Sequence, residues 1–252
     1  MGNKKITTAI ISIISLLGVI YEITYEDLLK QITGIIIISL TILLVLNIIN
    51  HYINISNAWL ILVYVKKLGI KRIYIRDISK NFSYHMANAK RIRIMALSGE
   101  IVIKKTQKEI VSALVNNKAF IQVLLCEPNS TFVLDTDEIE GRGANAKISD
   151  EINSTTDRLN RYALESREEK REEEIGQIKV GYYTTHLRSS LVICDTDWGW
   201  LTFSLPPQTA TQSISMELMF TENGLMSRMI KHFDQCWKIV EDRNNIITLP
   251  RP

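Results

Sequence analysis

The chain lacks the cysteine density of a secreted, disulfide-stabilised domain. Its 252 residues contain only three cysteines, Cys126, Cys194 and Cys236, and this number is neither high nor even. The Ile-rich composition, with 46% hydrophobic residues, also excludes an intrinsically disordered chain. No Walker loop, dinucleotide-binding fingerprint or Gly-x-Ser-x-Gly elbow is present, which excludes the classes of enzyme that depend on those motifs.

Charge is absent from two stretches near the N-terminus. Residues 6–21 and 32–50 contain no Asp, Glu, Lys or Arg. As α-helices they would be roughly 24 Å and roughly 28 Å long, which is close to the thickness of a bilayer core. The connection between them, residues 22–31, is too short for a domain. The sequence therefore predicts a transmembrane helical hairpin over residues 1–65, which argues against a freely soluble protein.

Basic residues flank the predicted hairpin and orient it in the membrane. Lys4 and Lys5 precede the first span and several basic residues follow the second, whereas the connection carries only Lys30. The positive-inside rule then places both termini in the cytoplasm, where the three cysteines are expected to stay reduced. No small-x-small cleavage site follows the first span, so we do not expect a cleavable signal peptide.

The segment after the second span, residues 57–65, is also apolar and includes Trp59 and Tyr64. It is too short to cross a bilayer separately. Two interpretations remain open, a continuation of the second helix or an interfacial turn with an aromatic belt.

Polar residues within the hairpin fall into two sets at helical spacing. The first set is small, predicts close helix packing and consists of Thr8, Ser12, Ser15 and Gly18. The second set shares one face of the second helix and consists of Ser39, Asn47, Asn50, His51 and Asn54. Amides facing lipid are costly, so this face should meet protein or water. We expect a homo-oligomer in which it lines a pore or joins helices; a simple anchor is the remaining alternative.

Residues 66–252 alternate between predicted strands and helices. This pattern predicts an α/β domain with a mixed sheet in the cytoplasm. The strands are expected at residues 70–75, 91–97, 120–125, 179–183, 191–194, 198–203 and 214–219, and the helices at 79–90, 106–116, 148–174 and 224–242.

Residues 132–145 read as a loop that carries four acidic side chains, Asp135, Asp137, Glu138 and Glu140. Such oxygens could bind a divalent cation, but the spacing of a calcium-binding loop is absent, so a solvated loop is favoured. The cytoplasmic histidines, His85, His186 and His232, have no metal-ligand spacing with a cysteine. We therefore expect no metal site and no cofactor.

Three segments of the C-terminal part resemble a phospholipase D-like domain. They are residues 89–99, residues 123–130 and the stretch from Ile178 to Asp195, and the resemblance extends over about residues 69–242. The family motif, His-x-Lys-x4-Asp followed by Gly-Ser, implies a histidine nucleophile and a lysine that neutralises the phosphoryl oxygens.

The chain departs from that motif at several positions. His186 is kept, Arg188 replaces the lysine, and Asp195 lies two residues after the expected position, which is Ile193. Arginine preserves the charge but changes the geometry. No Gly-Ser pair follows, and the single copy of the motif would require a homodimer. The resemblance therefore implies a non-catalytic relative, in which His186 is either a strand-edge polar residue or an anion-binding one.

Charge is distributed unevenly along the C-terminal part. Residues 66–118 hold thirteen basic and three acidic residues, whereas residues 127–174 hold fourteen acidic and seven basic ones. The basic half is predicted to bind anionic lipid or, alternatively, a polyanion such as nucleic acid or a nucleotide. The residues expected to do so are Lys66, Lys67, Lys71, Arg72, Lys90, Arg91, Arg93, Lys104 and Lys105.

A two-transmembrane hairpin joined to a degenerate phospholipase D-like domain resembles effector toxins of bacterial anti-phage systems such as retrons. The resemblance implies a multi-pass inner-membrane protein that disrupts the membrane when it is released from a cytoplasmic partner. In retrons that partner is a reverse transcriptase with its RNA–DNA. Two alternatives stay open: a membrane-tethered dimeric phosphodiesterase or nuclease using His186, Arg188 and Asp195, and a non-catalytic receptor for a nucleotide or polyanion.

Overall fold

The computed structural model describes Ser15 and residues 28–75, 80–141, 147–170, 174–184, 189–203 and 214–250. By its internal contacts the chain divides into two compact units, residues 1–64 and 65–252. Each unit is described by itself below.

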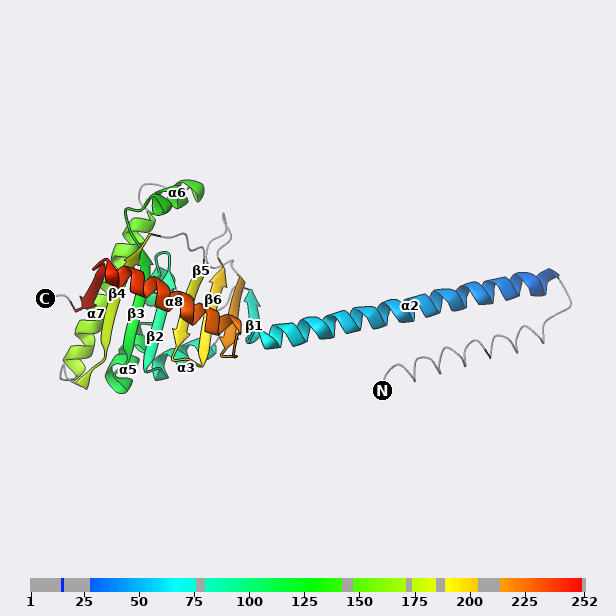
Figure 1. Ribbon diagram of the computed structural model, residues 1–252, viewed down its shortest axis with the longest axis horizontal. Helices are drawn as coiled ribbons and strands as arrows, with labels where there is room; N and C mark the ends of the chain where they lie inside the picture. Colours follow the sequence, from blue (N-terminus) through cyan, green and yellow to red (C-terminus); the bar gives the residue numbers. More distant parts are fainter. Residues whose placement is uncertain are drawn as a thin grey trace. The chain divides into compact units, whose positions relative to one another are not determined.

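In the described part of the chain, the N-terminal unit contains the helix α2 (Leu28–Lys67), which is 40 residues long and ends in the second unit (Figure 1). Residues 57–65 continue this helix, so the first of the two interpretations of that segment is the observed one. The helix begins four residues earlier than the uncharged run of residues 32–50, because Leu28 to Gln31 are themselves helical.

Within the described residues, none of the helices is both long enough and apolar enough to cross a membrane. Of the first polar set, Thr8, Ser12 and Gly18 lie outside the described residues, and Ser15 is helical and exposed. Of the second set, Ser39, Asn47 and Asn50 are exposed on α2, and the side chains of His51 and Asn54 lie outside the described part.

The second unit is built on one mixed sheet of eight strands in the order β1-β7-β6-β5-β2-β3-β4-β8. Strands β2, β3 and β4 are parallel, and the other neighbours pair antiparallel. The predicted α/β domain with a mixed sheet is thereby confirmed. The strand bounds are β1 (Ile70–Ile75), β2 (Arg91–Ala96), β3 (Phe120–Cys126), β4 (Gln177–Tyr183), β5 (Ser189–Cys194), β6 (Trp198–Phe203), β7 (Ile214–Met219) and β8 (Ile246–Leu249).

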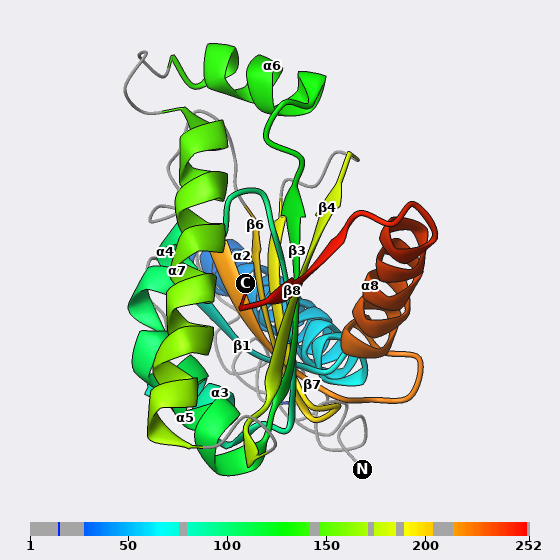
Figure 2. The same ribbon diagram turned by 90° about the vertical axis from the view of Figure 1, so that its left-hand side faces the viewer.

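Helices cover both faces of this sheet (Figure 2). One face carries α3 (Lys80–Asn88), α4 (Glu100–Lys105), α5 (Gln107–Asn117) and α7 (Ile148–Glu169), and the opposite face carries α8 (Leu225–Asp242). The remaining helix, α6 (Thr131–Ile139), extends beyond the end of β3. The four predicted helices, α3, α5, α7 and α8, each bury an apolar stripe, as the sequence pattern predicts, and α4 buries Ile103.

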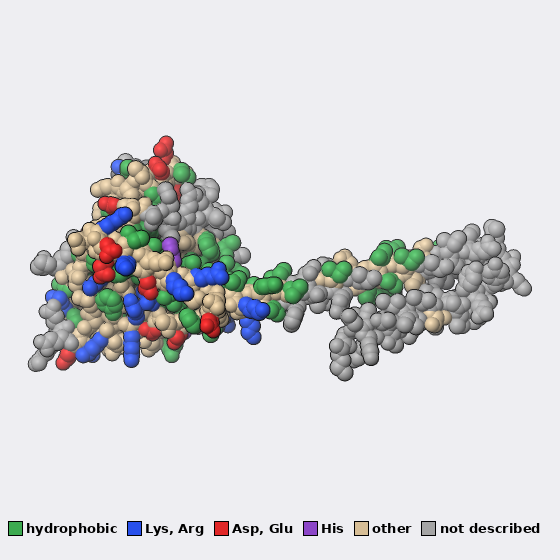
Figure 3. Space-filling view, viewed as in Figure 1, with side chains coloured by type: hydrophobic (Ala, Val, Ile, Leu, Met, Phe, Trp, Pro, Cys, Tyr) green, Lys and Arg blue, Asp and Glu red, His purple; other side chains and the backbone are tan. Residues whose placement is uncertain are grey.

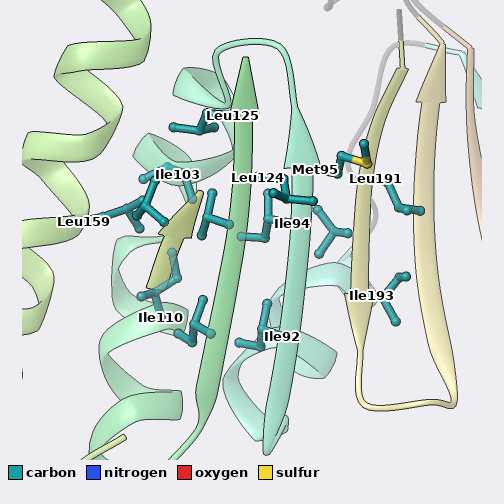
Figure 4. Close-up of a cluster of buried hydrophobic side chains, with 14 of the residues drawn as sticks. Ile92, Ile94, Met95, Ile103, Ile110, Leu124, Leu125, Leu159, Leu191 and Ile193 are labelled. Atoms are coloured by element: carbon teal, nitrogen blue, oxygen red, sulfur yellow. The ribbon is translucent and has the colours of Figure 1, made fainter. Parts of the chain in front are cut away.

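Buried apolar side chains lie on both faces of the sheet, against the helices of the first face and against α8. Figure 4 shows Ile103 of α4, Ile110 of α5 and Leu159 of α7 beside strands β2 and β3. Because helices cover both sides, five of the six residues of β2 are buried and the strand reads as an apolar run rather than an alternation.

Three elements differ from the sequence-based expectation. Most of the predicted acidic loop of residues 132–145 is helix α6, which Ser130 caps by accepting a hydrogen bond from the amide of Val133 at 3.4 Å. The expected C-terminal tail contains β8, which pairs with β4. An additional short helix, α4, precedes α5. These elements are four to nine residues long, so their periodic signal is weak.

Candidate functional site

The predicted catalytic motif surrounds strand β5. His186 and Arg188 lie outside the described residues, between the end of β4 at Tyr183 and the start of β5 at Ser189. Asp195 is the first residue after β5 and is described. It lies at the opposite end of the strand from Ser189, about 20 Å away for six residue steps of extended chain.

Asp195 connects the β5–β6 turn to the start of β2. Its Oδ1 accepts hydrogen bonds from the amides of Lys90 at 3.0 Å and Arg91 at 2.8 Å. Its own amide donates to the carbonyl of Arg91 at 2.7 Å. Asp195 has a positive φ of 54°, a conformation that Asp tolerates in tight turns. This carboxylate is therefore engaged in fixing the backbone.

The carboxyl ends of β2, β3 and β4 meet at one edge, where open α/β sheets usually bind ligands. The Tyr183 hydroxyl donates to the carbonyl of Ala96 at 3.3 Å, and the Cys126 thiol lies 3.5 Å from the Ser130 hydroxyl. Burial raises the pKa of both Tyr183 and Cys126, so both groups stay protonated at neutral pH. Neither Tyr183 nor Cys126 is therefore deprotonated for nucleophilic attack at neutral pH.

The nine basic residues predicted to bind an anion lie in separate places. Lys66, Lys67, Lys71 and Arg72 lie around the start of β1; Lys90 and Arg91 lie at the start of β2; and Lys104 and Lys105 lie on α4. Three strands separate β1 from β2, a distance of about 19 Å between them. These residues do not form the single basic surface that their nearness in the sequence suggested.

Arg93, the ninth of these residues, is buried rather than exposed on the surface. Its Nη1 donates to the carbonyl of Asp195 at 3.3 Å, and its Nε lies 3.3 Å from Asp234 Oδ1 on α8. Burial lowers the pKa of Arg93 and the Asp234 carboxylate opposes that effect. The contact therefore joins α8 to the middle of the sheet.

Sequence reasoning missed a buried carboxylate, Glu217 of β7, whose side chain is fully inaccessible. It accepts hydrogen bonds of 3.0 Å each from Lys71 Nζ, Tyr74 OH and Trp198 Nε1. Burial acts to raise the pKa of Glu217, but these three donors outweigh it and hold the pKa below its ordinary value. Its one signal in the sequence was an acidic residue in the middle of an otherwise apolar strand.

Aromatic side chains surround Glu217 beneath α3. The indole of Trp198 stacks against the imidazole of His85 at 4.8 Å between centroids, and Phe82 meets the edge of Trp198 at 5.5 Å. Burial, followed by the nearby charge of Lys71, lowers the pKa of His85, so this histidine is neutral at pH 7. The Glu217 cluster, meaning Lys71, Tyr74, His85, Trp198 and Glu217, joins β1, β6, β7 and α3.

This cluster lies directly after the end of α2. Only Leu68 and Gly69 separate the last residue of α2, Lys67, from β1. The carbonyl of Leu68 accepts from the amide of Leu225 at 2.9 Å, and the carbonyl of Gly69 accepts from Met219 at 2.8 Å. Gly69 has a φ of 76°, and a Cβ there would collide with the carbonyl oxygen of Met219, so glycine is required. The end of α2 is therefore joined to β1 by a short connection whose backbone is held by hydrogen bonds.

The described residues contain no group of three His, Cys, Asp or Glu side chains placed to hold a metal ion. Asp137 of the predicted acidic loop accepts a hydrogen bond from the amide of Ile148 at 2.9 Å. Its carboxylate thus fixes the start of α7, which is a structural role.

Comparisons with known proteins identify no family for this chain: no family model matches it, and no curated protein matches it significantly. Among solved structures it is similar to an archaeal chromatin protein, TrmBL2, with 10% identity over 81% of this chain and 68% of that chain at a TM-score of 0.39. It is also similar to Nuc from Salmonella typhimurium, a phospholipase D family member, with 12% identity over 67% of this chain and 88% of that chain at a TM-score of 0.38. Similarities of this size carry no argument about the activity of this chain.

Proposed function

We propose that this chain is a membrane-disrupting effector whose apolar N-terminal unit acts on a lipid bilayer and whose α/β domain controls it. The observation that supports the proposal is the surface of α2. Large apolar side chains are exposed along its described length, among them Ile36, Leu40, Leu43, Leu46, Ile53, Ile61 and Leu62. A helix that exposes so many large apolar side chains is unstable in water and needs a lipid or protein environment.

In this proposal the two uncharged runs form a hairpin in a bacterial inner membrane, with both termini in the cytoplasm. Homo-oligomers would form through Thr8, Ser12, Ser15 and Gly18, since small residues allow close contact. The second set, Ser39, Asn47, Asn50, His51 and Asn54, would then line a pore or join helices.

The basic residues at the end of α2 fit the same arrangement. Lys66, Arg72 and Leu68 are exposed at the junction, where cations can contact anionic headgroups. The proposed trigger is release from a cytoplasmic partner, of the kind formed by a reverse transcriptase with its RNA–DNA. The short connection from Lys67 to β1 would carry the change of state from domain to hairpin.

The first experiment measures propidium iodide uptake in bacteria induced to express the full chain alone, beside its His186→Ala variant. We expect uptake with both proteins, because membrane damage would not require the histidine. An undamaged membrane with both, in cells where the chain accumulates in the membrane fraction, would contradict the proposal.

A phospholipase D-class phosphodiesterase or nuclease is the second candidate, favoured by the order of His186, Arg188 and Asp195 in the sequence. The same experiment separates the two, because an enzyme loses its effect when the nucleophile is removed. Toxicity with the intact chain and none with His186→Ala would favour the enzyme.

A further inference from the structure

We propose that the sheet face beside α8 binds the phosphate groups of a nucleic-acid strand or nucleotide. The site lies at the amino ends of β2, β3 and β4, on the side of the sheet that α8 crosses. It is distinct from the carboxyl edge of these strands and from the end of α2, and it does not depend on the proposed membrane activity.

Strand register places the relevant residues side by side. Arg93 of β2 pairs with Gln122 of β3, which pairs in turn with Lys179 of β4. Two residues nearer the amino ends of these strands, and on the same face, Arg91 pairs with Phe120. Directly paired residues of parallel strands point to the same face, and Arg93 contacts α8, so all of them belong to the α8 face.

Three cations thus share an area about 10 Å wide, since neighbouring strands lie about 4.8 Å apart. The guanidinium of Arg91 is held in place by Gln122 Oε1, at 3.3 Å from Nε and 3.0 Å from Nη2. Lys179 Nζ lies 5.7 Å from the centre of the Phe120 ring. Gln122 occupies the Nε–Nη2 edge of Arg91, which leaves the Nη1–Nη2 edge to donate two parallel hydrogen bonds to a phosphate.

The floor of this area contains an incompletely satisfied cation. Arg93 is 4% exposed, and its Nε, although 3.3 Å from Asp234 Oδ1, makes no hydrogen bond. The facing acidic groups are Asp234, which is exposed on α8, and Asp195, whose Oδ1 is already bonded to two backbone amides. Lys231 and Lys238 lie one helical turn on either side of Asp234. The carboxylate of Asp234, which belongs to the same chain, therefore occupies the position next to Arg93 that a phosphate oxygen would take.

Figure 3 shows several Lys and Arg side chains on the face that α8 crosses. The anion-binding residues predicted from the sequence included Arg91 and Arg93, within residues 66–118, but not Gln122 or Lys179. Only strand pairing brings Lys179, which is far away in sequence, next to them.

The test uses the full chain in a non-ionic detergent and a short fluorescein-labelled oligothymidylate, with fluorescence anisotropy as the readout. We expect binding that weakens with salt between about 50 and 200 mM, with a logarithmic slope of about −1.4 for the two accessible cations, Arg91 and Lys179, on a single strand. The double variant Arg91→Ala with Lys179→Ala should raise the Kd about tenfold.

Three further variants make the result specific. The control Lys108→Ala with Arg161→Ala removes the same charge from α5 and α7 on the opposite face and should leave the Kd within about twofold. Asp234→Asn removes the competing carboxylate and should lower the Kd, which a merely structural role of Asp234 would not do. The conservative pair Arg91→Lys with Lys179→Arg should restore most of the binding lost in the alanine variant.

Competition with thymidine monophosphate distinguishes a strand from a free nucleotide as the source of the phosphate. Displacement at a concentration similar to that of the oligonucleotide favours the nucleotide, and the absence of displacement favours the strand. Equal loss in the two double variants, no gain with Asp234→Asn, or no binding at low salt would overturn the proposal.

Discussion

Glu217 is a charged residue whose carboxylate receives its hydrogen bonds from protein side chains instead of water. Its two carboxylate oxygens receive three hydrogen bonds from Lys71, Tyr74 and Trp198, which replace the water lost on burial. An interior carboxylate of this kind is expensive to disturb, because removal of its charge leaves Lys71 without its partner. The residue therefore stabilises the pairing of β1 with the sheet, where the chain enters from α2.

We predict that Glu217→Gln lowers the free energy of unfolding at pH 7 by about 1–3 kcal/mol. The pKa of Glu217 is lowered in the folded state, so its contribution is present above the ordinary value of 4.5 and is lost as the pH falls through the folded value. The variant should therefore lose less stability than the native chain on acidification.

The measurement is urea denaturation at pH 7 and pH 4, followed by near-ultraviolet circular dichroism. Glu222→Gln is the matched control, because Glu222 is exposed in the turn after β7. An acid dependence identical to that of the native chain would show that Glu217 does not carry the proposed charge.

The role of Asp195 in the structure differs from the catalytic role that its place in the sequence suggested. The sequence placed it near the expected position of a catalytic aspartate, and the structure shows its Oδ1 bonded to the backbone amides of Lys90 and Arg91. A residue 104 positions away in the chain cannot be identified as a hydrogen-bond partner from spacing alone. The predicted catalytic roles of His186 and Arg188 remain predictions.

At the scale of elements, the sequence predicted the helical conformation of α2 best and that of α6 least well. A 40-residue helix rich in Ile and Leu has a strong compositional signal. In α6, acidic residues suggested a loop, but Phe132, Val133 and Thr136 form a buried stripe that stabilises the helix. Four residues of β8 gain their strand conformation from pairing with β4, which no local pattern reports.

The role of the polar face of α2 can be tested by a double substitution. We predict that Asn47→Leu with Asn50→Leu abolishes ion leakage from cells expressing the chain, because both amides are exposed on one face of the helix and would contact water in a pore. Potassium efflux and membrane fractionation measure leakage and insertion separately. Thr41→Leu, on another side of α2, is the control. Unchanged leakage in the double variant would leave helix contact as the function of this face.

At the scale of the whole molecule, the division into two units separates the stability of the domain from that of α2. The entire eight-stranded sheet and the helices on both its faces belong to residues 65–252. The buried hydrophobic cluster, which runs from Phe82 to Leu249, also lies within that unit. The α/β unit thus holds a complete core of its own.

We predict that a fragment of residues 65–252 folds cooperatively without the N-terminal unit. Its thermal unfolding, followed by near-ultraviolet circular dichroism, should be a single transition with a midpoint close to that of the same signal in the full chain in detergent. A fragment with secondary structure but no near-ultraviolet signal would show that α2 contributes to the packing of the domain.

Patterns along the chain were sufficient for the class of fold, the approximate places of seven strands and the uneven charge, since all of these depend on local periodicity and composition. The side-chain contacts of the candidate sites were decided by the pairing of strands that lie far apart in the sequence. It placed Lys179 beside Gln122, put Glu217 among three donors and buried Arg93 against α8. The physical reason is that hydrogen bonds and ion pairs form between atoms near in space, and in a mixed sheet spatial neighbours are set by strand order rather than by distance along the sequence.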